Sequence, residues 1–186
     1  MSASSLQGYL LVAAPELRDP NFHRAVVLMV RHDQEEGALG VILNRPSGTS
    51  VQEVWKEVSQ TPCESTARLH LGGPVAGPLM ALHGQPFESE MEVLPGLHFS
   101  ADLESLQKLL TLDEQPLKLF VGYAGWSPGQ LEAELQQGSW RVGPASLEQV
   151  FDQGDSLWEQ SLRQIAGAQM VELLGIKHVP PDPTMN

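Results

Sequence analysis

The sequence has a single cysteine and no long apolar run. Cys63 is the one cysteine among 186 residues, so an internal disulfide and a four-thiolate zinc site are both excluded. No stretch approaches the roughly 20 apolar residues that a membrane helix needs. Residues 1–5 carry no basic segment of the kind that begins a secretory signal. These features predict a cytoplasmic protein in a reducing compartment, without membrane contact.

Basic residues are also scarce. The chain has 11 Lys and Arg against 23 Asp and Glu, a net charge of −12 with histidine neutral. The basic residues are scattered along the chain and form no cluster. Because affinity for nucleic acid depends largely on the counterions that clustered Lys and Arg release, direct contact with nucleic acid is disfavoured.

The length and the pattern of apolar residues predict one α+β domain over residues 1–174. Hydrophobic runs between turn residues predict strands at Gly8 to Ala14, Ala25 to His32, Ala38 to Asn44, Arg68 to Leu71, Leu79 to His83, Leu117 to Tyr123 and Trp140 to Val142. The glycine-rich segment 72–77 predicts a tight turn with positive φ or a close approach of two backbone segments. His70 and His83, on the flanking strands, could face each other. Residues 175–186 are rich in proline and are expected to form a flexible tail.

Helices are indicated by apolar spacing and by capping residues. Apolar residues at i, i+3, i+4 and i+7 predict a helix from Val51 to Val58, capped by Ser50 or Thr49. Asp102 is the expected cap of a second helix, and a last helix is expected from about Ser156 to Ile165. The segment Ser127-Pro128-Gly129-Gln130 predicts a capping box, with Ser127 as N-cap and proline at the first helical position.

Several ordered motifs together resemble one known family. They are Gly40-Val41-Ile42-Leu43-Asn44-Arg45-Pro46, Gly72-Gly73-Pro74-Val75, Leu82-His83 and Gly122-Tyr123-Ala124-Gly125-Trp126, followed by Pro128-Gly129-Gln130-Leu131-Glu132. With Asp19-Pro20-Asn21-Phe22 and Trp158 they resemble the AlgH/YqgE family of bacterial proteins, from about residue 6 to about residue 166. The resemblance implies a single α+β domain with a bulged mixed or antiparallel sheet, curled into a barrel-like core with flanking helices. It implies no reaction, because most of the family is uncharacterised and some members are labelled transcriptional regulators.

A ligand site is the sharpest functional hypothesis for these motifs. A helix N-terminus at Ser127 and Gln130 offers free N–H groups to an anion, Trp126 could add an aromatic platform, and Arg45 a planar guanidinium fork. The proposed ligand-binding residues are Asn44, Arg45, Gly72, Gly73, Gly125, Trp126, Ser127 and Gln130. The alternative is that Asn44 to Pro46 ends a strand and that Trp126 belongs to the core.

Catalytic and metal motifs are weak. Gly125-Trp126-Ser127-Pro128-Gly129 matches the nucleophile-elbow pattern G-x-S-x-G. However, an oxyanion hole uses the N–H of the residue after the nucleophile, and Pro128 has none. The six histidines show no metal-binding spacing. We therefore expect no catalytic residues, no metal and no cofactor.

Three classes of function remain open. The favoured one is a small binding or regulatory protein that acts through a protein partner or a small anionic ligand. The second is a DNA-binding regulator, which the charge disfavours. The third is an enzyme with an unrecognised site near Arg45, Gly72-Gly73 and Trp126. The sequence leaves the oligomeric state undetermined.

Overall fold

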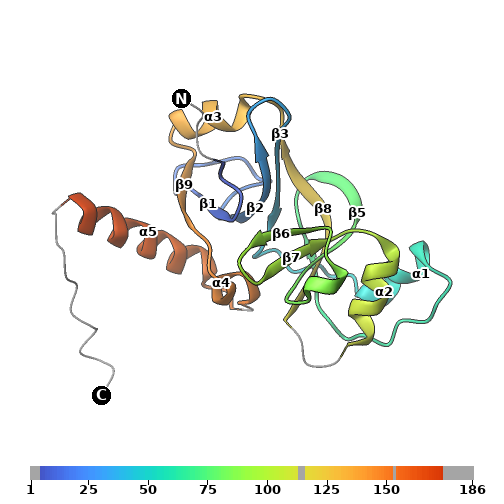
Figure 1. The fold of residues 1–186 in the computed structure, drawn as a ribbon. Helices are drawn as coiled ribbons and strands as arrows, with labels where there is room; N and C mark the ends of the chain where they lie inside the picture. The colour runs from blue at the N-terminus through green and yellow to red at the C-terminus, as the bar shows by residue number, and fades with distance from the viewer. Residues whose placement is uncertain (1–4, 113–115, 153, 174–186) are drawn as a thin grey trace, which may run out of the picture.

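The protein is an α+β domain built on one nine-stranded sheet (Figure 1). The computed structural model describes residues 5–112, 116–152 and 154–173. The strands are β1 (Tyr9–Ala13), β2 (Val26–Asp33), β3 (Gly37–Ile42), β4 (Leu69–Leu71), β5 (Val75–His83), β6 (Met91–Leu94), β7 (Leu97–Ser100), β8 (Leu117–Trp126) and β9 (Trp140–Pro144). The helices are α1 (Val51–Val58), the 3-10 turn η1 (Pro86–Glu88), α2 (Leu103–Thr111), α3 (Gln130–Gln136), α4 (Leu147–Phe151) and α5 (Leu157–Leu173).

The sheet is mixed, bulged and curled. Its strand order is β6-β7-β5-β8-β3-β2-β1-β9, with β4 beside β8 as the one parallel pair in the described chain. Register shifts interrupt the β2–β3, β5–β8 and β6–β7 pairings, and such bulges bend and twist a sheet. Gln7, just before β1, donates from Nε2 to the carbonyl of Glu92 in the edge strand β6 at 3.1 Å. The curled sheet that the family resemblance implies is therefore confirmed.

A backbone crossing beside β8 requires glycine. The segment that leaves β4 passes so close to β8 that a Cβ on Gly72 would lie 2.2 Å from the carbonyl oxygen of Gly122. A Cβ on Gly73 would lie 2.1 Å from the carbonyl carbon of Tyr123. Gly122 itself has φ +72°, a conformation that residues with side chains rarely adopt. The glycines therefore serve a close crossing of two chain segments.

Three apolar clusters hold the helices against the sheet. One joins α4 and α5 to β1, β2 and β5 and includes Phe120, Val150, Leu157 and Ile165. The second joins α3 to the other side of β1 and β2 and includes Trp126, Leu131 and Trp140. The third joins α1 and α2 to β4 and β8 and includes Val51, Trp55, Leu106 and Leu109. The far half of α5 extends away from the body of the domain (Figure 1).

Of the two alternatives for residues 72–77, the close backbone approach is confirmed and the tight turn between paired strands is wrong. β8 lies between β4 and β5, because its residue Leu119 pairs with Leu69 on one side and with Ala81 on the other. The expectation that His70 and His83 face each other is therefore also wrong. His83 pairs across β5 and β7 with His98. The apolar pattern did not predict strands β6 and β7, which have only four residues each.

The expected helix caps have mixed outcomes. Ser50 caps α1 in a complete capping box with Glu53, and Asp102 caps α2 by accepting from the N–H of Ser105 at 2.9 Å. The prediction of a capping box with Ser127 as N-cap is wrong. Helix α3 begins only at Gln130, and its N-cap is Gly129, with φ +76°. Only the return contact forms, from the N–H of Ser127 to the side chain of Gln130 at 3.1 Å.

Helix α5 is longer than expected, with 17 described residues. No helix in the described ranges is long and apolar enough to cross a bilayer. The predicted flexible tail at 175–186 lies outside the described residues.

The crossing at Gly73 can be tested by adding one methyl group. We expect Gly73→Ala to lower the free energy of unfolding by about 3 kcal/mol or more, since the rigid backbone of Tyr123 occupies the place of the new Cβ. The control is Gly48→Ala, whose Cβ would meet nothing within 4 Å and should change stability by less than about 0.5 kcal/mol. Urea unfolding of both variants measures the difference. Equal stabilities would contradict the crossing.

Candidate functional site

The structure does not gather the predicted ligand residues into one site. Asn44 ties two backbone segments together: its Oδ1 accepts from the N–H of Val26 at 2.9 Å, and its Nδ2 donates to the carbonyl of Arg24 at 2.8 Å. Arg24 is the one described residue other than glycine with positive φ, at 53°. Arg45 donates from Nη2 to the carbonyl of His23 at 2.9 Å. Asn44 and Arg45 thus hold the chain at residues 23–26.

Trp126 belongs to the core. It is 5% exposed and packs against Phe22 and Trp140, with ring centroids 6.1 Å away in each case. Its indole N–H donates to Oε2 of Glu134 at 3.0 Å, and the indole of Trp140 donates to the same oxygen at 2.8 Å. One carboxylate therefore holds two buried indoles together, and the face of Trp126 is not a free platform.

Gly125, Trp126 and Ser127 border a groove of about 470 Å³. Its arginine, Arg31, is already paired with Glu36 at 3.1 Å. The helix behind Ser127, α3, has only seven residues, and in the described chain no histidine makes a hydrogen bond with the Ser127 side chain. The arginine of this groove is therefore not free to bind an anion, and Ser127 is not activated as a nucleophile by a described histidine. Gln130 is exposed and donates to Glu134 at 2.9 Å.

A second hollow is richer in polar chemistry. This cavity of about 100 Å³, here called the His70 cavity, is lined by Leu43, Asn44, Pro46, Arg68, His70, Asp152, Gly154, Asp155 and Leu157. It forms because the chain after β3 runs beside β4: Pro46 bridges to His70, and the N–H of Leu71 donates to the carbonyl of Arg45 at 2.8 Å. The other wall is supplied after α4 and at the start of α5 by Asp152, Gly154, Asp155 and Leu157. Of the predicted ligand residues, Asn44 alone lines this cavity.

Buried Lys118 fixes the wall opposite β4. Lys118 belongs to strand β8 and is 1% exposed. Its Nζ donates to the carbonyls of Val150 at 3.1 Å and of Asp152 at 2.9 Å. Burial lowers the pKa of Lys118 to about 8, and the nearby Asp152 carboxylate opposes that shift. Lys118 therefore anchors the end of α4 and the start of the cavity wall.

His70 is the cavity's unusual group. It is 4% exposed, and its Nδ1 has no hydrogen-bond partner among the described residues. Burial, together with the positive charge of Lys118, lowers the pKa of His70 to about 4, although the carbonyls of Leu119 and Arg68 act in the opposite direction. The imidazole is thus neutral near pH 7. A buried polar atom without a partner is costly, and no contact among the described residues relieves this cost at Nδ1 of His70.

Charged groups at the rim of the cavity are also unengaged. Arg68 and Asp155 are exposed, and within the described ranges neither side chain makes a hydrogen bond or an ion pair. Leu157 is the first residue of α5, so the cavity meets the N-terminal end of a 17-residue helix, where free N–H groups favour an anion. Arg68 and Pro46 also border an adjoining groove of about 350 Å³ along residues 47–50.

The sequence pattern did not single out the charged and histidine side chains of this site, which are Arg68, His70, Asp152 and Asp155. It also gave no role to Lys118, which lies behind them. One signal was present, because Lys118 interrupts an otherwise apolar strand segment, Leu117 to Tyr123. The His70 cavity does not suit a metal ion. In the described part of the chain, no three His, Cys, Asp or Glu side chains lie close enough together to hold one.

Two other histidines have both ring nitrogens engaged. His83 is fully buried, with Nδ1 accepting from the N–H of Gln85 at 3.2 Å and Nε2 3.0 Å from the hydroxyl of Ser100. Because Nδ1 accepts, Nε2 carries the proton and cannot act as a base toward Ser100. Ser100 in turn donates to the carbonyl of Glu88. This arrangement joins β5, β7 and η1 and is structural.

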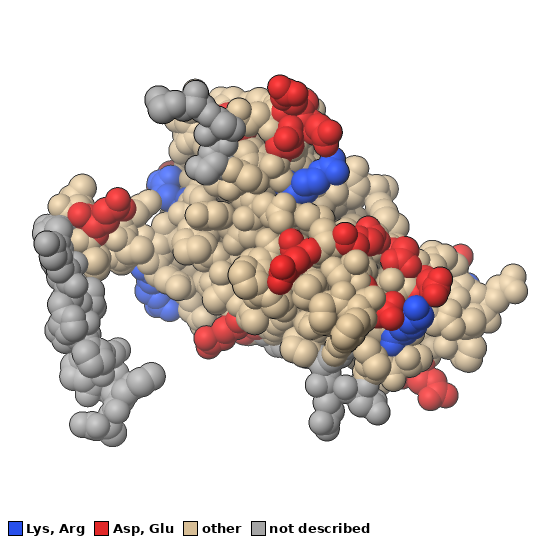
Figure 2. Space-filling view, viewed as in Figure 1, with Lys and Arg blue, Asp and Glu red and all other residues tan. Residues whose placement is uncertain are grey.

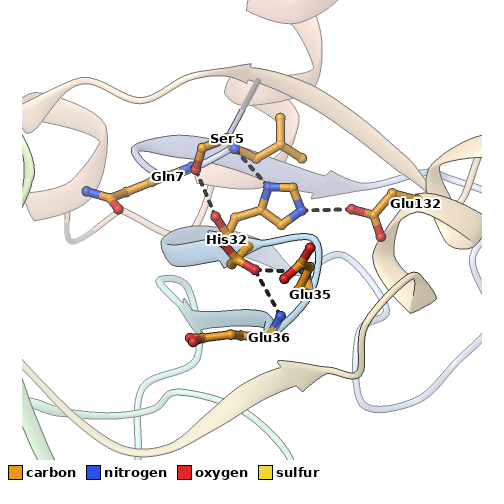
Figure 3. A network of polar contacts seen from close by, with 8 residues as sticks. Ser5, Gln7, His32, Glu35, Glu36 and Glu132 are labelled. Carbon is orange, nitrogen blue, oxygen red and sulfur yellow. Dashed lines mark hydrogen bonds and ion pairs between the residues drawn. The ribbon is translucent and has the colours of Figure 1, made fainter. Parts of the chain in front are cut away.

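His32 fixes the N-terminal segment in the same manner (Figure 3). Its Nδ1 accepts from the N–H of Leu6 at 3.0 Å, and its Nε2 lies 2.9 Å from Oε1 of Glu132. The hydroxyl of Ser5 donates to the His32 carbonyl at 3.0 Å. The His–Glu pair resembles a catalytic dyad, yet no ring nitrogen is left for a substrate.

The tautomer of His32 is therefore a testable consequence. We expect a neutral ring protonated at Nε2 and unprotonated at Nδ1, because Nδ1 must accept from Leu6. Long-range ¹H–¹⁵N NMR spectra distinguish the two nitrogens. Exposed His23 is the internal control, because its Nδ1 lies 3.5 Å from the carbonyl of Leu17, which favours the opposite tautomer, protonated at Nδ1. A His32 ring protonated at Nδ1 at neutral pH would contradict the contact with Leu6.

Acid should destabilise the fold through His70 and His83. Burial, with a smaller contribution from His98, lowers the pKa of His83 to about 4, as burial does for His70. Between about pH 6.5 and pH 4 the unfolded chain binds two protons that the folded chain excludes, so stability falls as the pH falls. Each histidine contributes up to about 1.4 kcal/mol per pH unit in that window.

Urea unfolding from pH 7 to pH 4 measures this slope. His70→Gln should remove about one histidine's share of the slope, whereas His23→Gln, a change at an exposed ring, should leave it unaltered. If the His70→Gln slope equals that of the parent protein, the excluded proton at His70 is wrong.

Comparisons with known proteins identify the family. A UPF0301 protein of Chlorobaculum tepidum is 40% identical, over 96% of this chain and 95% of the relative. One from Streptomyces coelicolor is 39% identical, over 98% and 96%. The solution structure of AlgH from Pseudomonas aeruginosa has a TM-score of 0.76 at 28% identity, covering 96% of this chain and 97% of that one. A crystal structure from Corynebacterium diphtheriae has a TM-score of 0.71 at 26% identity, covering 88% and 89%. The AlgH-like family model matches residues 10–170, and the chain belongs to this AlgH-like family.

Proposed function

We propose that this protein binds a small ligand with an anionic group in the His70 cavity. The observation that carries the proposal is a cavity lined by unengaged charges and by the buried side chain of His70, whose Nδ1 has no hydrogen-bond partner among the described residues. A neutral imidazole supplies one hydrogen bond to a ligand.

The anionic group is assigned to the side of the cavity formed by Arg68 and the start of α5. The Arg68 guanidinium is exposed and makes no ion pair within the described ranges, so its planar fork is available to a carboxylate or a phosphate. The N-terminal end of α5 adds free N–H groups and a partial positive charge at the same cavity. A regulatory role would then depend on occupancy of this site.

The two other classes of function have less support. Acidic side chains gather in several groups on the face drawn in Figure 2, where basic ones are fewer, and the net charge of −12 opposes contact with nucleic acid. For an enzyme, the described His32 and His83 have both ring nitrogens engaged. A cytoplasmic location stays a prediction from the single cysteine.

NMR titration of the ¹⁵N-labelled protein tests the site. We add inorganic phosphate, acetate and glycine separately and follow the backbone amides of Gly154 and Leu157. At least one probe should shift both amides in a saturable way. Arg68→Gln should weaken that probe at least about tenfold, since a hydrogen bond to a charged group contributes about 1.5–3 kcal/mol.

The matched control is Arg31→Gln, which removes an exposed guanidinium from the other groove and should leave the affinity unchanged. Two outcomes would overturn the proposal: none of the probes shifts these amides, or the best probe binds Arg68→Gln as tightly as the parent protein.

A further inference from the structure

The His70 cavity carries charges of both signs that do not neutralise each other. Arg68 lines it from the position just before β4, and Asp155 from the segment before α5. No ion pair joins Arg68 to Asp152 or Asp155 in the chain that the structure describes. An anion alone would use Arg68 and leave the carboxylate of Asp155 as a repulsive neighbour. The lining therefore favours a ligand that carries both a negative and a positive group.

The two aspartates are not equivalent. Asp152 already accepts from the N–H of Gly154 at 2.7 Å through Oδ1 and lies near the ammonium of Lys118. Asp155 has no such partner among the described residues. Asp155 is therefore the acceptor for a cationic group of the ligand.

The size of the cavity restricts the ligand further. Its volume of about 100 Å³ is smaller than those of the two grooves described above. That space suits a molecule of a few non-hydrogen atoms, in which the two charges must be close together. An amino acid meets this condition because its ammonium and carboxylate groups are attached to the same carbon atom.

On the basis of the proposed function, we infer that the ligand of the His70 cavity is a small amino acid, with its carboxylate at Arg68 and the start of α5 and its ammonium at Asp155. A divalent cation is a poor alternative, since no described group of three ligating side chains is present. Phosphate uses the cationic side of the cavity but has no group for Asp155.

Three matched probes separate the contributions of the two charges. Propionate is alanine without its amino group, and ethylamine is alanine without its carboxylate. In NMR titrations that follow the amides of Gly154 and Leu157, we expect alanine to bind at least about tenfold more tightly than propionate or ethylamine.

Two substitutions locate the ammonium. Asp155→Asn keeps the size of the side chain and removes its charge, and should weaken alanine about tenfold without weakening propionate. Glu16→Gln, at an exposed carboxylate outside the cavity, is the control and should change neither affinity.

The outcomes separate the inference from the proposed function. If propionate binds as tightly as alanine, or if Asp155→Asn leaves the affinity for alanine unchanged, the amino-acid inference is wrong while an anion site at Arg68 stands. If alanine, propionate, acetate, glycine and phosphate all fail to shift the two amides, both are wrong.

Discussion

The close crossing of residues 72–73 over β8 is the constraint on which the rest of the structure depends. Before Gly122, β8 pairs with β4, and after it the β8 residues Ala124 to Trp126 pair with β3, while β5 pairs with β8 as far as Tyr123. The switch requires backbone to pass backbone at a distance that leaves no space for a Cβ on Gly72 or Gly73. Because β8 changes partners here, one strand joins both halves of the curled sheet.

The same crossing determines where the His70 cavity forms. β4 has only three residues and is held between β8 and the chain that follows β3, through its bridge to Pro46. His70 is therefore paired with Phe120 in β8, and the centroids of their rings are 5.7 Å apart. The positive charge of Lys118, also in β8, helps to lower the pKa of His70. Lys118 in turn holds the carbonyls of Val150 and Asp152. A change in β8 packing would thus alter both walls of the cavity.

The sequence predicted what depends on local patterns and failed where distant segments meet. The caps at Ser50 and Asp102 were correct because a cap involves residues within one turn of helix. Strand β8 was recognised from its apolar residues, but its partners were not, because the pattern of an element does not name its neighbours. Glycines 72 and 73 were noticed as unusual, yet a turn and a crossing require the same absence of a side chain. Trp126 lies in the core, as the alternative interpretation had it.

The hydrogen bonds of the buried polar groups distinguish structure from function in this domain. Buried groups normally find partners, and the indoles of Trp126 and Trp140 share Glu134, while His83 is held between Gln85 and Ser100. Each of these groups is satisfied within the protein and closes a contact between elements. Two side-chain atoms in the described chain depart from this rule, Oγ of Ser161 and Nδ1 of His70, and of these two residues His70 lines the cavity with unengaged charges. An energetic cost that the fold itself does not relieve is the physical reason to place a ligand there.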